Sequence, residues 1–162
     1  MCKESAVRAA LTAAQEHCAL CPRRCGAARR ETAGLCGMGA ELKVARAALH
    51  YWEEPCISGC DGSGTVFFSG CTLRCVFCQN REISAGGFGQ AISVERLREV
   101  FRELEAAGAS NINLVSPTQF APWIALALEE VPGIPVVWNT GGYERVETLR
   151  LLEGKVQIYL PD

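Results

Sequence analysis

Three cysteines close together in the sequence have the spacing of ligands to a metal cluster. Cys71, Cys75 and Cys78 fall within eight residues, directly after a short apolar run. Three thiolates on one short loop can each bind one iron of a cubane iron–sulfur cluster, and the fourth iron is then open to a substrate. A structural zinc site would need four closed ligands. The spacing therefore favours a catalytic iron–sulfur cluster at this loop.

A second group of cysteines precedes the first. Four thiols within nineteen residues make up this group: Cys18, Cys21, Cys25 and Cys36. The first two form a Cys-x2-Cys pair, whose sulfurs can converge on one tetrahedral ion. Four soft ligands suit zinc or a second iron–sulfur cluster, and the sequence does not choose between them. We expect the nearby arginines to form a solvated basic rim that offsets the thiolate charge: Arg23, Arg24, Arg29 and Arg30.

The composition of the chain narrows the class of protein. It has 162 residues, 49% of them hydrophobic, and a net charge of −2, which is enough for one domain with a real core. Charged residues near the start interrupt any secretion signal, and no apolar run approaches the ~18 residues that span a bilayer. The slightly acidic balance does not favour nucleic-acid binding. We expect a soluble, cytoplasmic protein whose clustered thiols bind metal rather than pair as disulfides.

The ten cysteines are unevenly distributed, because all lie between Cys2 and Cys78. This change in cysteine content along the chain predicts an N-terminal helix with a Cys-rich metal-binding segment over residues 1–62. A packed α/β part is expected over residues 63–162. Cys2, Cys56 and Cys60 are most simply small, partly buried thiols.

Hydrophobic patterns predict the elements that position these cysteines. Ser5 can cap a helix over residues 6–17, and Ser93 can cap another that ends before Gly108. Short apolar runs predict strands at 65–69, 111–115, 135–138 and 155–160, and residues 61–64 are expected to be a loop. Further helices are expected at 123–130 and 144–152. Residues 42–49 fit either a strand or a helix.

The alternation of strands and helices predicts an α/β fold with parallel strands and right-handed crossovers. Such folds keep their chemistry at the C-terminal strand ends, here residues 70–78, 116–119, 139–142 and 161–162. The three-cysteine loop lies on the first of these. The last strand would form an exposed edge without a covering helix, so we expect the sequence to be a fragment of a longer protein.

The spacing Cys-x3-Cys-x2-Cys, with the aromatic Phe77 before the last cysteine, resembles the signature of the radical S-adenosylmethionine (radical SAM) superfamily. Longer segments resemble its pyruvate formate-lyase activating enzyme-like members, and the resemblance runs from about Cys18 to the last residue. Those segments are Trp52–Gly59, Cys78–Asn80 with Ile83 and Ser84, Asn111–Thr118, and Ile158–Asp162.

The resemblance implies a partial (βα) TIM-type barrel whose first four strands are present, with a 4Fe–4S cluster held by Cys71, Cys75 and Cys78. One electron, from a donor such as flavodoxin or ferredoxin, would cleave S-adenosylmethionine to methionine and a 5′-deoxyadenosyl radical that abstracts hydrogen from a substrate. In activating enzymes the target is a glycine Cα of a partner, a glycyl radical enzyme. Phe77 would pack near the adenine.

The sequence departs from the superfamily after the second parallel strand. Most members carry Gly-Gly-Glu there to hold the substrate amino group, whereas this chain has Ser116-Pro-Thr-Gln119. The hydroxyls of Ser116 and Thr118 and the carbonyl of Gln119 could take this role, or the segment is simply a turn. Asn139 and the residues after it are likewise a ligand rim or a turn. Asp162 resembles the start of the Asp-x-Lys motif of activating enzymes.

Two other functions stay open. The group Cys18–Cys36 could belong to a non-catalytic zinc or iron–sulfur binding or electron-transfer module, which would bind metal without depending on S-adenosylmethionine. A radical SAM enzyme could also act on RNA or a small molecule, because the shared chemistry does not fix the substrate.

Overall fold

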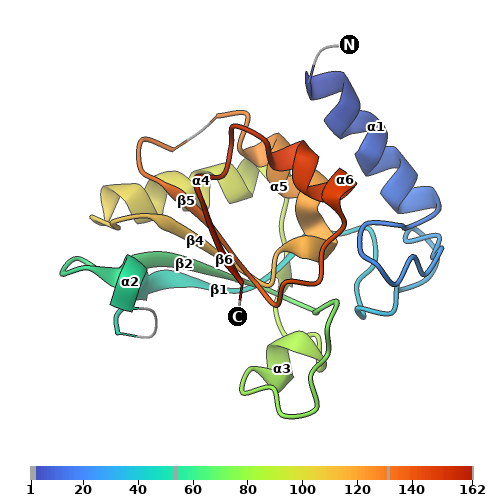
Figure 1. Ribbon diagram of the computed structural model, residues 1–162, viewed down its shortest axis with the longest axis horizontal. Helices are drawn as coiled ribbons and strands as arrows, with labels where there is room; N and C mark the ends of the chain where they lie inside the picture. The colour runs from blue at the N-terminus through green and yellow to red at the C-terminus, as the bar shows by residue number, and fades with distance from the viewer. Residues whose placement is uncertain (1–2, 53–54, 131, 162) are drawn as a thin grey trace.

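The computed structural model describes residues 3–52, 55–130 and 132–161, which form a mixed α/β fold on one six-stranded sheet (Figure 1). The strand order is β3-β1-β2-β4-β5-β6. The strands are β1 (Lys43–His50), β2 (Ser63–Phe68), β3 (Gln90–Ala91), β4 (Ile112–Val115), β5 (Val136–Thr140) and β6 (Ile158–Pro161). As predicted, β2, β4, β5 and β6 are parallel, whereas β1 and β3 are antiparallel additions at one side.

The main helices lie on one face of the sheet. Helices α4 and α5 pack side by side against this face, and α1 packs on the outer side of α5 (Figure 1). The helices are α1 (Lys3–Glu16), α2 (Pro55–Ser58), α3 (Arg81–Ser84), α4 (Val94–Ala106), α5 (Ala121–Ala127) and α6 (Val146–Leu149), with 3-10 turns η1 (Thr118–Phe120) and η2 (Arg150–Leu152). Every residue of α5 is buried, so this helix forms the centre of the core.

The predicted helix after Ser93 is confirmed. The Ser93 hydroxyl accepts a hydrogen bond from the backbone N–H of Arg96 at 3.1 Å, which satisfies one of the free donors of the first turn. The apolar stripe of this helix is buried against the sheet: Leu97, Val100, Phe101 and Leu104. Gly108 has a φ of +89° just past the helix end, where glycine is the favoured residue.

The structure corrects several boundaries and settles one ambiguity. The first helix begins at Lys3, so Ser5 lies inside it and is not its N-cap, and α5 ends at Ala127. Residues 43–50 are a strand, because β1 pairs with both β2 and β3. The expected loop at 61–64 is wrong at its second half, because Gly64 belongs to β2 and pairs with Ile112 of β4. There is no room for a side chain at Gly64, since a β-carbon would stand 2.9 Å from the Cβ of Ala109. The helix expected at 144–152 is only one short α-helix followed by a 3-10 turn, and the last strand begins at Ile158.

Two further expectations concern the division of the chain and its ends. Strand β1 lies in the same sheet as the later strands, while the division at residue 62 stays a prediction. The roles predicted for Cys2 and Asp162 fall outside the described residues. The expectation that Cys56 and Cys60 are partly buried is wrong, because both are exposed. In the ranges that the structure describes, no helix is long and apolar enough to cross a membrane.

Candidate functional site

The end of β4 is bonded to the end of β2. The side-chain amide of Gln119 donates to the carbonyl oxygens of Ser69 at 2.9 Å and Gly70 at 3.0 Å, at the point where β2 leaves the sheet. The same amide donates to the Ser116 carbonyl at 2.7 Å. Gln119 is 2% exposed, so these bonds are shielded from water. This side chain fixes the start of the loop that carries Cys71, Cys75 and Cys78, which we name the cluster loop (residues 70–78).

The end of β5 also reaches the cluster loop. The backbone N–H of Ser116 donates to the Asn139 carbonyl at 3.0 Å, which joins the ends of β4 and β5. A β-carbon at Gly141 would stand 2.8 Å from the Leu73 side chain, so the turn after β5 packs directly on the cluster loop. The carboxyl ends of β4 and β5 therefore lie against the loop that carries the three cysteines.

Helix α3 closes the cluster loop from the other side. In Figure 1 this helix lies below the sheet, away from α4 and α5. The backbone N–H of Gly70 donates to the Ile83 carbonyl at 2.9 Å, and the Ser84 hydroxyl donates to the sulfur of Cys78 at 3.3 Å. A hydrogen bond to sulfur stabilises the thiolate that a metal cluster requires. Ser84 is buried, so this donor is held in place by packing.

The donor set of the cluster loop fits an iron–sulfur cluster. Cys71, Cys75 and Cys78 are free and half-buried, and thiolates are the ligands such clusters use. Across residues 3–52, 55–130 and 132–161, no three Cys, His, Asp or Glu side chains are arranged as a metal site where they stand. The three thiols share one loop but do not converge on one point. Their side chains would have to turn toward one another to hold a cluster.

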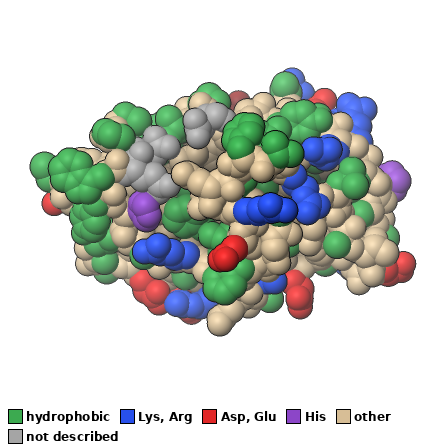
Figure 2. Space-filling view, turned by 90° about the horizontal axis from the view of Figure 1, so that it is seen from below, with side chains coloured by type: hydrophobic (Ala, Val, Ile, Leu, Met, Phe, Trp, Pro, Cys, Tyr) green, Lys and Arg blue, Asp and Glu red, His purple; other side chains and the backbone are tan. Residues whose placement is uncertain are grey.

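The outer part of the loop is open to a ligand. Phe77 is 87% exposed and Val76 is 92% exposed, although both are apolar. Figure 2 shows the molecule from below, the side of α3, where hydrophobic side chains lie among Lys and Arg. An exposed aromatic ring beside the cysteines offers a flat face for stacking.

The predicted cofactor-binding residues differ in their surroundings. Phe77 is exposed, and Ser116 and Asn139 are half-buried at their strand ends. Thr118 is 2% exposed, and its hydroxyl donates to the Glu144 carboxylate at 2.6 Å. The Thr140 hydroxyl donates to the same carboxylate. Glu144 therefore links the ends of β4 and β5. This role could not be predicted from the local sequence, because the two hydroxyl partners come from other elements.

The second group of cysteines folds into a compact segment, which we name the four-cysteine segment (residues 18–38). Cys18, Cys21 and Cys36 are buried and Cys25 is half-buried; all four are free. A β-carbon at Gly34 would contact the sulfurs of Cys25 at 3.4 Å and Cys36 at 3.5 Å, so both thiols border the same small space.

The ionisation of these thiols is governed by burial and by neighbouring charges. Burial raises the pKa of Cys18 and of Cys36, and other thiolates of the segment act in the same direction. The guanidinium of Arg29 and backbone hydrogen bonds oppose this rise. Burial also acts to raise the pKa of Cys25, but hydrogen bonds with the backbone of Ala27 and Leu35 outweigh it, so this pKa is lowered.

The expectation of a solvated arginine rim is wrong for Arg29, which is 2% exposed. Its guanidinium lies over the rings of Trp123 at 4.8 Å and Phe120 at 5.4 Å. It donates to the carbonyls of Gly39 at 2.8 Å and Gln119 at 2.6 Å, and its Nη2 has no hydrogen-bond partner. Among the described residues no carboxylate forms an ion pair with it, so its charge is balanced only by the two carbonyls and the two aromatic rings that it contacts.

Two exposed arginines connect the four-cysteine segment to the cluster loop. Arg23 donates from Nε to the Thr72 carbonyl at 2.6 Å and from Nη2 to the Leu73 carbonyl at 3.1 Å. In the opposite direction, Arg74 of the loop donates to the Leu35 carbonyl at 2.9 Å. Sequence reasoning placed Arg23 on a basic rim and missed these bonds, because they join segments far apart in the chain.

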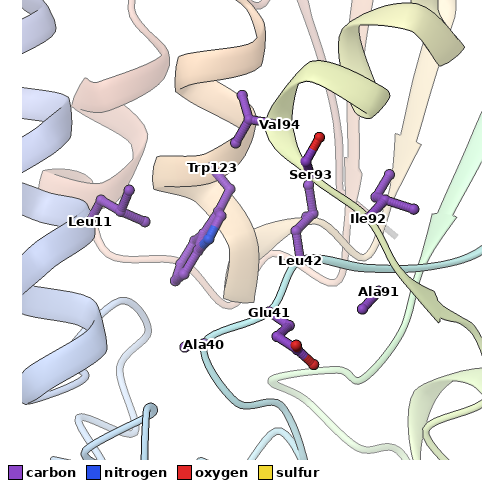
Figure 3. A pocket seen from close by; sticks show the side chains of 9 residues that line it. All are labelled: Leu11, Ala40, Glu41, Leu42, Ala91, Ile92, Ser93, Val94 and Trp123. Atoms are coloured by element: carbon purple, nitrogen blue, oxygen red, sulfur yellow. The ribbon is translucent and has the colours of Figure 1, made fainter.

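A surface hollow of about 450 Å³ has no cysteine in its lining. It is bordered by α1, α5 and the segments that enter β1 and α4 (Figure 3). Its apolar lining includes Leu11, Leu42, Ile92 and Trp123, and Glu41 is the one carboxylate among its lining residues. This hollow lacks the groups that the cluster loop offers, so the candidate site is the strand-end region and not the hollow.

Comparisons with known proteins agree with this choice. The family model for the Radical SAM superfamily matches residues 65–160, more than half of the chain, and the match includes the cluster loop. An uncharacterised protein of Methanocaldococcus jannaschii is 32% identical over 157 residues, an alignment that covers 91% of this chain and 45% of that protein. The chain thus spans less than half the length of this relative. No solved structure matches the chain at a significant level.

Proposed function

Because the chain belongs to the radical SAM superfamily, we propose that Cys71, Cys75 and Cys78 hold a 4Fe–4S cluster and that the protein cleaves S-adenosylmethionine reductively. The observation that carries this proposal is the position of three free, half-buried thiols at the carboxyl end of β2, where parallel sheets bind their ligands. When bound, the reduced cluster supplies the electron that breaks the sulfonium bond, which yields methionine and a 5′-deoxyadenosyl radical.

The residues of this chain would bind and orient the reactants. The Ser84 hydroxyl donates to the Cys78 sulfur, and such a bond makes the site easier to reduce. The exposed ring of Phe77 would stack on the adenine, and Ser116 and Asn139 would contact the amino and carboxylate groups of S-adenosylmethionine. Thr118 and Gln119 act indirectly, because the Thr118 hydroxyl and the Gln119 side-chain NH2 group hold the strand ends together.

The finer features of the family are part of the same proposal. The consecutive parallel strands β2, β4, β5 and β6 would be the first four of a partial TIM-type barrel. The hydrogen donor would be a glycine Cα of a partner enzyme, which the resemblance of residues 52–59 and 111–118 to activating enzymes supports. A glycyl radical signal in electron paramagnetic resonance, formed on such a partner only when S-adenosylmethionine is present, would test this substrate class.

Cluster assembly tests the binding half of the proposal. The protein is reconstituted anaerobically with iron and sulfide, reduced, and studied by electron paramagnetic resonance before and after S-adenosylmethionine is added. The cofactor should change the signal, because it binds the open iron. Cys71→Ala should abolish the signal, whereas Cys56→Ala, which removes an exposed cysteine, should leave it intact. An unchanged signal in Cys71→Ala would contradict the assignment.

A further inference from the structure

We propose that the four-cysteine segment binds one zinc ion and that this ion fixes the position of the cluster loop. The zinc site does not depend on any reaction of S-adenosylmethionine. Its effect on the iron–sulfur cluster does rest on the proposed function, so the tests below measure the zinc and the loop directly.

The backbone of the segment brings the cysteines together. The backbone N–H of Cys18 donates to the Ala27 carbonyl at 3.0 Å, and the N–H of Gly26 donates to the Cys18 carbonyl at 2.9 Å, so Cys25 is held beside Cys18. A β-carbon at Gly34 would lie 3.4 Å from the Cys25 sulfur and 3.5 Å from the Cys36 sulfur, so these two thiols border the same space. The fold thus gathers three of the four thiols in one place, as a tetrathiolate site requires.

The surroundings favour a closed zinc site over an open catalytic cluster. Cys18 and Cys36 belong to the hydrophobic core, together with Leu20, Met38 and Leu42. A closed set of four thiolates in such surroundings is the usual form of a structural zinc site. The sulfurs do not stand at metal-binding positions in the described chain, but rotation about each Cα–Cβ bond moves a sulfur without moving the backbone.

The buried charge of Arg29 supports the same conclusion. Four thiolates around Zn²⁺ carry net negative charge, which is costly inside a protein unless a cation lies nearby. Arg29 acts electrostatically on both Cys18 and Cys36, and its Nη2 is buried without a hydrogen-bond partner. A zinc–thiolate centre thus provides the counter-charge that this guanidinium lacks among the described carboxylates.

The contacts between the two cysteine groups explain how zinc would act on the loop. Arg23 donates hydrogen bonds to the carbonyls of Thr72 and Leu73, and Arg74 donates one to the carbonyl of Leu35. These bonds bind the middle of the cluster loop to a segment that has little regular structure of its own. Zinc would replace secondary structure as the element that keeps this segment rigid.

Metal analysis of the purified full chain tests the site. We expect about one zinc per chain, as for a structural tetrathiolate site. The double variant Cys18→Ser/Cys21→Ser should lose it, and the matched control Cys56→Ser/Cys60→Ser, which changes two exposed cysteines, should keep it. Iron with sulfide in place of zinc, or undiminished zinc in the first variant, would overturn the proposal. Should that variant fail to fold, a mercurial reagent added to the wild type must release one zinc as the segment's thiols react.

Hydrogen exchange of the backbone amides of residues 70–78 tests the effect on the loop. Removal of zinc should speed this exchange by about tenfold, and Arg23→Ala should do the same while zinc is retained. Arg30→Ala is the control, because this exposed arginine donates to the Gln15 side chain of α1 and, within the described residues, has no hydrogen bond to the cluster loop. Unchanged exchange after zinc removal would contradict the bracing role. If zinc is bound and protects residues 70–78 from exchange, but the protein does not cleave S-adenosylmethionine, then only the proposed function is contradicted.

Discussion

The carbonyl oxygen of Cys36 lies so close to Gly70 that a β-carbon at residue 70 would stand 2.8 Å from it. Gly70 also has a φ of +76°, a backbone conformation that other residues adopt only with strain. The residue before the first cysteine of the cluster loop therefore packs directly on the last cysteine of the four-cysteine segment. The two groups of thiols, separate in the sequence, share one packed contact.

This contact predicts the effect of Gly70→Ala. The variant should lose about 1–2 kcal/mol from backbone strain alone, and more because its methyl group meets the Met38 side chain and the Cys36 carbonyl. Gly154→Ala is a matched control, since Gly154 has a similar φ of +79° but nothing within 4 Å of the added carbon. Urea unfolding of both variants measures the difference. Equal losses would show that the packing of residue 70 against Cys36 and Met38 has no energetic weight.

Arg29→Met tests whether the buried guanidinium balances a metal–thiolate centre. With zinc bound, the variant should be destabilised by about 3 kcal/mol or more, because one member of a buried charged pair is removed. After zinc removal this loss should shrink or reverse, since the methionine then replaces a poorly compensated buried charge. Denaturant unfolding with and without zinc measures both values, with exposed Arg30→Met as control. A variant that is more stable than wild type in the zinc-bound state would contradict this role.

Ser84→Ala should make the iron–sulfur cluster harder to reduce. The variant loses the hydroxyl that donates to the Cys78 sulfur at 3.3 Å, so the thiolate keeps more negative charge. The midpoint potential in a redox titration should become more negative, with the amount of cluster unchanged. Ser5→Ala, on the exposed side of α1, provides the comparison. A potential equal to that of wild type would mean that this bond is absent when the cluster is bound.

Thr118→Val separates a bracing role from direct cofactor binding. The variant removes one donor to Glu144 and should lower the free energy of unfolding by about 1–3 kcal/mol, whereas Thr118→Ser keeps a hydroxyl and should lose less. The affinity for S-adenosylmethionine, measured by calorimetry, should stay within a factor of a few in both variants. A large loss of affinity at unchanged stability would instead identify Thr118 as a ligand of the cofactor.

The strand–helix pattern and the cluster loop were predictable from sequence because their signals are local. The cap at Ser93 and the stripe that starts at Leu97 identified α4, and the apolar runs identified the four parallel strands in order. Residues 42–49 were ambiguous because the burial of this strand, β1, does not alternate along the chain. The strand pairs with β3 on one side and with β2 on the other. Here tertiary pairing, and not periodicity, decides the structure.

The links between the elements could not be predicted from sequence, because each joins residues far apart in the chain. Arg29 has the same local context as its exposed neighbour Arg30, and only the packing of Phe120 and Trp123 against it shows that it is buried. The bond from Thr118 to Glu144 likewise requires the ends of β4 and β5 to lie side by side.

The formation of 5′-deoxyadenosine tests the central claim most directly. The reconstituted protein is reduced anaerobically with S-adenosylmethionine, and the products are separated by liquid chromatography and identified by mass. Wild type should form 5′-deoxyadenosine and methionine, and Cys71→Ala, Cys75→Ala and Cys78→Ala should form neither, while Cys60→Ala behaves as wild type. No product from a protein that contains its cluster, or equal product from the three cluster-loop variants, would contradict the account.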